Sequence, residues 1–256
     1  MMGLQAHAVR VRYGARVAVQ GVSLAVAPGE VLAILGANGC GKSSLLRALA
    51  GVQPHEGVIE RPATVGYLPQ ETAARAALTA FEVVLLGRIR TLGMRAAPGE
   101  LAAAQAVLDE MGIAGLSEVP IGALSGGQRQ LVFIAQVLAS TPSLLLLDEP
   151  TSALDIAHQV QVLAHLRAIT ARRGLATIAV LHDLNAAARF ADRIALMHQG
   201  RILGADRPAA VLAPAMLRDA YGVDVSVMAG PDGYPVVIPR FGAGMLDATQ
   251  IERMVS

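Results

Sequence analysis

The fold of this chain is decided by one stretch, Gly36-Ala37-Asn38-Gly39-Cys40-Gly41-Lys42-Ser43-Ser44. It follows the apolar run Val31–Leu35 and precedes the apolar-periodic segment Leu45–Leu49, so we expect the order strand, G-x-x-x-x-G-K-S loop, helix. Glycines let the backbone turn tightly and direct successive N–H groups into one concave nest that binds phosphate. The helix that follows presents its free N-terminal amides to the same anion. The stretch therefore predicts a phosphate-binding loop within an α/β fold.

Two side chains in this loop indicate the chemistry of the bound phosphates. Lys42 is placed to reach the β- and γ-phosphates of a nucleotide, and the Ser43 hydroxyl is placed to bind Mg²⁺. The chain has 21 lysines and arginines, and Lys42 is its only lysine. A compact ammonium fits inside a phosphate nest, whereas the planar fork of an arginine does not. A nucleotide with Mg²⁺ is therefore the expected ligand.

Composition excludes several classes of protein. A length of 256 residues permits one large domain or two small ones, and a net charge of +1 gives no global field that would recruit nucleic acid. The single cysteine rules out an internal disulfide framework. No apolar run reaches the roughly 18 residues of a membrane span, and the first residues lack the order of a signal peptide. With no Trp and 3% aromatic residues, there are few platforms for stacking nucleic-acid bases.

The regions on either side of the loop indicate an α/β chain with additions. Residues 4–13 and 17–26 alternate loosely between apolar and polar, which predicts an antiparallel β-lobe. Residues 58–60 and 64–68 are expected to be short strands, whereas 78–116 has helical periodicity and is expected to be a helical insertion. Tyr13 ends a strand near the loop, where it would stack on an adenine ring or be an ordinary half-buried tyrosine.

Polar groups follow two predicted strands. The run 144–147 is too short for a buried helix and predicts a strand buried on both faces, which ends in Asp148 and Glu149. The strand 176–181 ends in His182. Open α/β sheets bind ligands at the carboxyl ends of their strands, so we expect all three side chains to face the phosphates. The alternatives are a turn capped by the two acids and a histidine satisfied at a strand end.

A second helix start lies at Leu124-Ser125-Gly126-Gly127-Gln128. Ser125 is at an N-cap position, and two glycines are expected to leave the amides of the first turn uncovered, which suits an anion. The remaining candidates have plainer interpretations. His158 and His165 are seven residues apart, about 10 Å along a helix, too far to share a metal ion. Cys40 is at a helix N-terminus, where the pKa of a thiol can fall, but we interpret it as a small loop residue.

These motifs, with Gln70 and the Ser152–Asp155 segment, occur in the order and spacing of an ABC transporter ATPase subunit. The resemblance covers about residues 4–240. It implies a nucleotide site built from the Gly36–Ser44 loop and an adenine-stacking Tyr13. Asp148 resembles the magnesium ligand, Glu149 the general base and His182 the switch histidine on the γ-phosphate. Gln70 resembles the glutamine that touches Mg²⁺ and the attacking water.

The resemblance also implies partners. In this family two copies pack head to tail, so that Ser125, Gly126, Gly127, Gln128 and Asp155 would reach the ATP of the other copy. Two membrane permease subunits and, indirectly, a substrate-binding protein would complete an importer at the cytoplasmic face of the inner membrane. The expected organisation is an ATPase domain over 1–240, a helical subdomain at about 78–140 within it, and a tail over 241–256. No nucleic-acid partner is expected.

The type of cargo is less sharply indicated. Leu78-Thr79-x-x-Glu82, His182–Asn185 and Tyr221–Asp224 resemble importers of metal chelates, namely ferric siderophores, haem or cobalamin. The short connection over 57–64 looks as much like molybdate or metal-ion relatives. Two positions depart from the common pattern, Leu131 and Gln136, where many members carry arginine.

Two other classes of protein are the competing hypotheses. A soluble ABC ATPase of DNA repair, chromosome maintenance or translation predicts long coiled coils, zinc cysteines or tandem halves. A P-loop kinase or GTPase would lack both the signature at 124–128 and His182.

Overall fold

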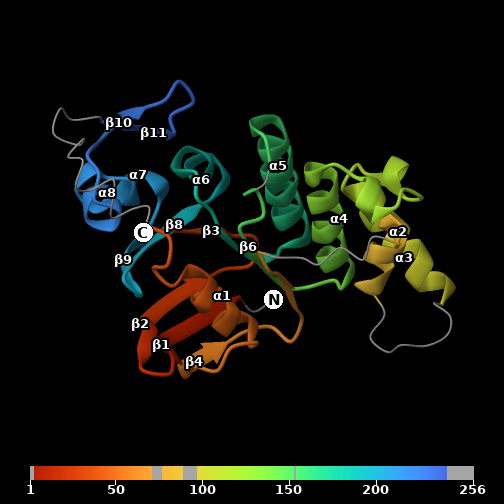
Figure 1. Cartoon of the computed structure of the whole chain (residues 1–256), viewed down its shortest axis with the longest axis horizontal. Helices are drawn as coiled ribbons and strands as arrows, with labels where there is room; N and C mark the ends of the chain where they lie inside the picture. Colours follow the sequence, from red (N-terminus) through yellow and green to blue (C-terminus); the bar gives the residue numbers. More distant parts are fainter. Residues whose placement is uncertain (1–2, 71–76, 89–96, 153, 241–256) are drawn as a thin grey trace.

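The computed structural model describes residues 3–70, 77–88, 97–152 and 154–240. At its centre lies a six-stranded sheet with the order β5-β6-β7-β3-β8-β9 (Figure 1). Neighbouring strands are parallel except for the β8–β9 pair at the edge. The strands are β3 (Val31–Leu35), β5 (Val65–Leu68), β6 (Leu144–Asp148), β7 (Ala176–Val180), β8 (Arg193–His198) and β9 (Arg201–Asp206).

Strands β3, β6 and β7 are buried along their whole length because both faces of the sheet are covered. In β3, Val31, Ala33 and Leu35 belong to the core on one face, whereas Leu32 and Ile34 belong to the core on the other. Every residue of β6 is buried, as expected for a strand covered on both faces. The predicted parallel sheet is confirmed, and its carboxyl edge is fixed by the shared direction of β3, β6 and β7.

A three-stranded antiparallel lobe packs on one side of this sheet. It has the order β2-β1-β4, with β1 (Leu4–Tyr13), β2 (Arg16–Val26) and β4 (Glu56–Glu60). Helix α1 (Lys42–Ala50) shares one apolar core with the lobe and the sheet, as its place between them in Figure 1 shows. The strand predicted at 58–60 belongs to this lobe, since Ile59 pairs with Ala6.

Helices gather at one end of the molecule and over the other face of the sheet (Figure 1). Helices α2 (Ala80–Leu86), α3 (Pro98–Glu110) and α4 (Gly126–Ala139) pack against one another, with two 3₁₀ turns, Ala114–Leu116 and Ile121–Ala123, between α3 and α4. The predicted helical insertion is confirmed, although residues 89–96 within it lie outside the described ranges. Helices α5 (Ile156–Arg173) and α6 (Leu184–Phe190) complete this core.

The last elements are α7 (Pro208–Val211), α8 (Pro214–Tyr221), β10 (Val225–Ala229) and β11 (Pro235–Pro239). Strands β10 and β11 form a separate two-stranded sheet. The Asn185 side chain anchors it to α6, since its Oδ1 accepts from Val237 N at 2.8 Å and its Nδ2 donates to Val237 O at 3.3 Å. The predicted tail, 241–256, lies outside the described residues. Among the helices of the described ranges, none combines the length and apolarity that crossing a membrane would take.

Candidate nucleotide site

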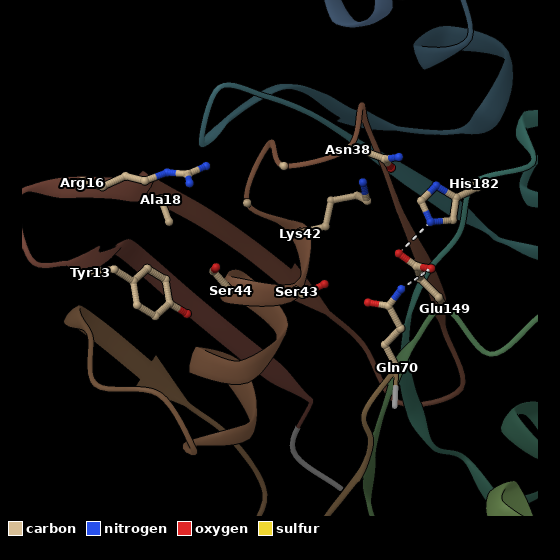
Figure 2. A pocket seen from close by; sticks show the side chains of 12 residues that line it. Tyr13, Arg16, Ala18, Asn38, Lys42, Ser43, Ser44, Gln70, Glu149 and His182 are labelled. Atoms are coloured by element: carbon tan, nitrogen blue, oxygen red, sulfur yellow. Dashed lines mark hydrogen bonds and ion pairs between the residues drawn. The ribbon is translucent and has the colours of Figure 1, made fainter. Parts of the chain in front are cut away.

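An open cavity of about 420 Å³ lies at the carboxyl ends of β3, β6 and β7 (Figure 2). Most of the residues that line it are residues the sequence singled out. The lining comprises Tyr13, Arg16, Ala18, Asn38, Gly39, Gly41, Lys42, Ser43, Ser44, Gln70, Glu149 and His182. Four other residues predicted for the nucleotide site do not line this surface: Gly36, Ala37, Cys40 and Asp148.

The loop between β3 and α1 is shaped by close backbone approaches. A Cβ on Gly36 would lie 2.2 Å from the Met197 carbonyl oxygen, and a Cβ on Gly41 would lie 2.3 Å from that of Ala18. Both glycines also have positive φ, 149° and 111°. Only glycine meets both demands, so the loop can keep its amides turned toward the cavity.

Lys42 is the most buried charged group of the loop. Its Nζ donates to the carbonyl oxygens of Gly36 at 2.8 Å and Ala37 at 3.0 Å, and only 5% of the residue is exposed. Within the described part of the chain these bonds use two of the three N–H donors of the ammonium. The remaining donor and the positive charge are available to a phosphate in the cavity.

Ser43 and Asp148 form an oxygen-rich pair under the loop. Ser43 Oγ donates to Asp148 Oδ1 at 2.9 Å, while the buried Oδ2 of Asp148 has no hydrogen-bond partner among the described residues. Burial raises the pKa of Asp148, against the opposing effect of the Ser43 hydrogen bond. A buried carboxylate oxygen without a partner, next to a hydroxyl, fits a small hard cation such as Mg²⁺.

Three polar side chains from three segments meet at Glu149 (Figure 2). Gln70 Nε2 donates to Glu149 Oε2 at 2.9 Å, and His182 Nε2 lies 2.6 Å from Glu149 Oε1. The segments follow β5, β6 and β7, whose parallel order brings their ends to one edge. Glu149 has a φ of 54°, in the left-handed region that a non-glycine residue enters at a cost of about 1–3 kcal/mol. Strain of this kind concentrates at functional sites.

Tyr13 lies at the outer wall of the cavity with Arg16 and Ala18, all from the β1–β2 hairpin. Its ring is partly exposed, and its hydroxyl donates to Gln53 Oε1 at 3.2 Å. Arg16 and Ala18 were missed from the sequence, because an arginine and an alanine in an edge hairpin carry no motif. Their closeness to Tyr13 along the chain was the one available signal.

Cys40 is buried in the loop and does not line the cavity. Burial raises the pKa of its thiol, and this effect outweighs the attraction of the thiolate to Lys42. A lowered pKa from the helix N-terminus is therefore not what the structure gives. Its Sγ would lie 2.8 Å from a Cβ on Gly36, so the side chain fills space within the loop.

The second predicted helix start is a capping box. Ser125 Oγ accepts from Gln128 N at 3.2 Å, and Gln128 Oε1 accepts from Ser125 N at 3.0 Å, so the predicted N-cap is confirmed. Ser125 and Gly126 are exposed. Gly127 is buried against the ring of His158, so the expectation that both glycines leave the turn uncovered holds only at Gly126.

Asp155 caps α5 beside this turn. Its Oδ1 accepts from the backbone N of His158 at 2.9 Å and lies 2.8 Å from the ring Nδ1 of the same residue. Those two hydrogen bonds, the backbone one first, lower the pKa of Asp155. Ala153, in the predicted motif, lies outside the described residues. Neither Asp155 nor the Ser125–Gln128 turn lines the cavity, so the predicted site residues fall into two separate groups.

Comparison with known proteins identifies the family. A family model described as ABC transporter matches residues 19–152, just over half of the chain. The chain belongs to the ABC transporter family. Among curated ABC relatives, the hemin import ATP-binding protein HmuV of Gloeobacter violaceus is 40% identical over 95% of this chain and 96% of its own. HmuV of Streptomyces coelicolor is 41% identical, over 91% of this chain and 88% of its own.

A solved structure of an ABC transporter has the same fold as this chain. A chain from an inward-facing structure described as a metal-chelate type ABC transporter superposes with a TM-score of 0.86, at 28% identity, over 94% of this chain and 98% of that one. The predicted fold class is thereby confirmed. This ABC family member binds ATP, and it is the ATP-hydrolysing subunit of an importer.

Proposed function

We propose that this chain powers the uptake of a metal chelate of the haem type by binding Mg²⁺-ATP and hydrolysing it between two copies of itself. The observation that carries the hydrolysis is the meeting of Gln70, Glu149 and His182 opposite Lys42 in one cavity. The choice of cargo is supported by relatives named for hemin import and by the metal-chelate type transporter. Ferric siderophores and cobalamin belong to the same chemical class.

The cavity would hold the nucleotide by three kinds of contact. Tyr13 would stack on the adenine, the amides of Gly36–Ser44 would surround the phosphates, and Lys42 would donate to the β- and γ-phosphate oxygens. Ser43, Asp148 and Gln70 would supply the oxygen ligands of Mg²⁺, and the unpartnered Oδ2 of Asp148 supports this assignment. Bound there, the ion would neutralise charge on the phosphate oxygens.

Glu149 would act as the general base. In the structure both of its carboxylate oxygens are engaged, one by Gln70 and the other by His182, which fixes the direction in which the carboxylate points. A base must lie within hydrogen-bond reach of the proton that it accepts, so a water bound beside Gln70 would take the place of one of these contacts. His182 would then turn to the γ-phosphate as a hydrogen-bond donor.

One chain supplies only part of the charge neutralisation that phosphoryl transfer needs. The Ser125–Gln128 turn, exposed at Ser125 and Gly126, and Asp155 lie away from the cavity, although a helix N-terminus is suited to a phosphate. We therefore assign them to the nucleotide of a second copy packed head to tail. ATP would be enclosed only when two copies meet.

The proposed organisation is one ATPase domain over 1–240, with a helical subdomain at about 78–140, followed by the tail 241–256. The helical subdomain would dock two membrane permease subunits, and a substrate-binding protein would act through them. The chain would lie at the cytoplasmic face of the inner membrane as a peripheral subunit. Cargo of the molybdate or metal-ion type is the alternative within importers, and a soluble ABC ATPase without a permease is the more distant one.

Reconstitution with the permease subunits encoded beside this chain tests the proposal. Haem delivered by its binding protein is expected to stimulate ATP hydrolysis in proteoliposomes, whereas molybdate and free metal ions are not. Glu149→Gln is the matched control, because it keeps the size of the base and removes its basicity. Stimulation by molybdate alone would indicate an importer of the molybdate or metal-ion type. Full ATPase activity that no permease or cargo alters would contradict an importer.

A further inference from the structure

His158 joins two groups that lie far apart in the sequence, the Ser125–Gln128 turn at the start of α4 and Asp155 at the start of α5. The sequence assigns it no role. In the structure its ring Nδ1 lies 2.8 Å from Asp155 Oδ1. The same ring also packs against Gly127. A Cβ on that glycine would lie 2.9 Å from the ring Cδ2 and 3.0 Å from Cγ.

These contacts fix the ring. An ionised carboxylate only accepts hydrogen bonds, so the 2.8 Å contact places a proton on Nδ1 of His158. The same carboxylate oxygen also accepts from His158 N, so a single acid holds both the backbone and the ring of this residue. The ring therefore has one orientation, and it lies over the glycine.

The contact also gives a reason for glycine at position 127. A side chain there would come closer than 3.0 Å to the ring and within 3.3 Å of the His158 Cβ. The turn can thus approach α5 only because position 127 has no side chain, and the ring fills the space that remains. Close steric contact of this kind couples the position of the turn to that of α5, although the ring itself is partly exposed.

We propose that His158 is a positioning residue, which holds the Ser125–Gln128 turn and Asp155 in one fixed arrangement so that both reach the nucleotide of a partner copy together. This inference rests on the proposed head-to-tail dimer, because only there would a nucleotide meet these groups. His158 does not line the cavity of its own chain, so it is not a catalytic residue of that cavity. Its effect would be on closure of the dimer and not on loading of the monomer.

The test uses the full-length chain carrying Glu149→Gln, which is expected to hold ATP in a closed dimer. Two quantities are measured with Mg²⁺-ATP: the dimer dissociation constant by light scattering, and the affinity of the dilute monomer for a fluorescent ATP analogue. Adding His158→Ala is expected to weaken the dimer about tenfold and to leave the monomer affinity unchanged. Unchanged monomer affinity also reports that the variant is folded.

Four further variants separate positioning from general damage. His158→Asn restores an N–H near the Nδ1 position and is expected to recover part of the dimer affinity. His165→Ala is the matched control, since His165 is on the same helix and its ring has one hydrogen bond within the described ranges, to Gln161 O at 2.8 Å; it is expected to have no effect. Gly127→Ala is expected to weaken the dimer as His158→Ala does, and the double variant is expected to be no worse than either alone.

Two outcomes overturn the inference alone: a His158→Ala dimer as tight as its parent, or effects of Gly127→Ala and His158→Ala that simply add. Failure of the Glu149→Gln parent to dimerise with ATP overturns the proposed dimer and this inference with it. The two kinds of failure are therefore distinguished by the parent protein.

Discussion

Among the residues of the phosphate-binding loop, Gly36 has the closest steric constraint. A Cβ at this position would meet both Met197 O at 2.2 Å and Cys40 Sγ at 2.8 Å, and the first of these atoms belongs to the backbone of a central strand. Gly36→Ala is therefore expected to displace the loop from β8, to destabilise the fold by more than about 2 kcal/mol and to abolish ATP binding. Thermal melting and titration with ATP measure the two effects.

Gly39 provides the matched control. It also has positive φ, 72°, but a Cβ there would have nothing within 4 Å. Gly39→Ala is expected to cost only the backbone strain of about 1–2 kcal/mol and to leave measurable ATP binding. Equal losses in the two variants would show that φ and not the approach to Met197 sets the requirement at position 36.

Asp148 makes stability depend on pH in a direction opposite to that of an ion-paired acid. Because burial raises its pKa, the folded state binds the proton more tightly than the unfolded state. Its stabilising contribution is full below the ordinary pKa of about 3.9 and is lost as the pH rises through the folded pKa. At pH 7 the ionised carboxylate therefore costs stability when no cation is bound.

Asp148→Asn is accordingly expected to raise the melting temperature of the nucleotide-free protein at pH 7, by about 2–4 °C for each kcal/mol recovered. The gain is expected to vanish toward pH 4. The same variant is expected to gain less from Mg²⁺-ATP than the parent does, because a carboxylate ligand has been removed. A lower melting temperature at pH 7 without nucleotide would contradict this account of Asp148.

At the level of helices, Glu110 ties the end of α3 to the end of α5. It forms ion pairs with Arg172 and Arg173, and Arg173 also donates to Leu138 O of α4 at 3.1 Å. Burial works to raise the pKa of Glu110, but the hydrogen bonds from the two arginines outweigh it and lower this pKa. Its contribution to stability is thus present above the ordinary pKa of about 4.3 and is lost as the pH falls through the folded value.

Glu110→Gln is expected to lower the free energy of unfolding by about 1 kcal/mol at pH 7 and by much less near pH 3. Urea titrations at the two pH values measure the difference. Asp109→Asn, next to it on α3, is the control, since among the described residues the Asp109 carboxylate accepts from Gln105 alone, at 3.1 Å. A loss at Glu110 that is the same at both pH values would mean that the ion pairs are not its source.

Elements with a strong local period could be predicted, and contacts between distant segments could not. The run 144–147 is apolar throughout and the strand 176–180 is apolar except for Thr177, which identifies them as central parallel strands. Nothing within Glu56–Glu60 says that it pairs with β1, because that choice depends on residues 50 positions away. The contact of His158 with Gly127 was invisible for the same reason.

For the whole molecule, the proposed assembly predicts that ATPase activity depends on protein concentration. The permease-free chain is expected to hydrolyse ATP slowly when dilute, with specific activity that rises as dimers form, because each cavity lacks the turn that a partner supplies. Activity per chain measured across a hundredfold concentration range tests this. Ser125→Ala is expected to lower the plateau, while wild-type specific activity independent of concentration would contradict the shared site.

Of the two groups of candidate site residues, only the group that lines the cavity could be placed from the sequence motifs. The residues that line the cavity come from motifs whose order along parallel strands fixes where they meet, and this is why Lys42, Glu149 and His182 could be placed together beforehand. The second group has a helix N-terminus that suits an anion, but its proposed ligand belongs to another chain, so nothing within one chain brings it to a nucleotide. The role of this second group was inferred from the resemblance to ABC transporter ATPase subunits. The structure of a single chain does not reveal that role.

The position of β3 has a consequence for synthesis of the protein. This strand is made early, but it pairs with β7 and β8, and the loop after it rests on Met197. A ribosome must therefore translate as far as Met197 before the nucleotide pocket can close, and a nascent chain halted at residue 190 has no platform for its Gly36–Ser44 loop. Premature termination before residue 197 should yield polypeptides that chaperones and proteases remove, with no half-active ATPase left behind.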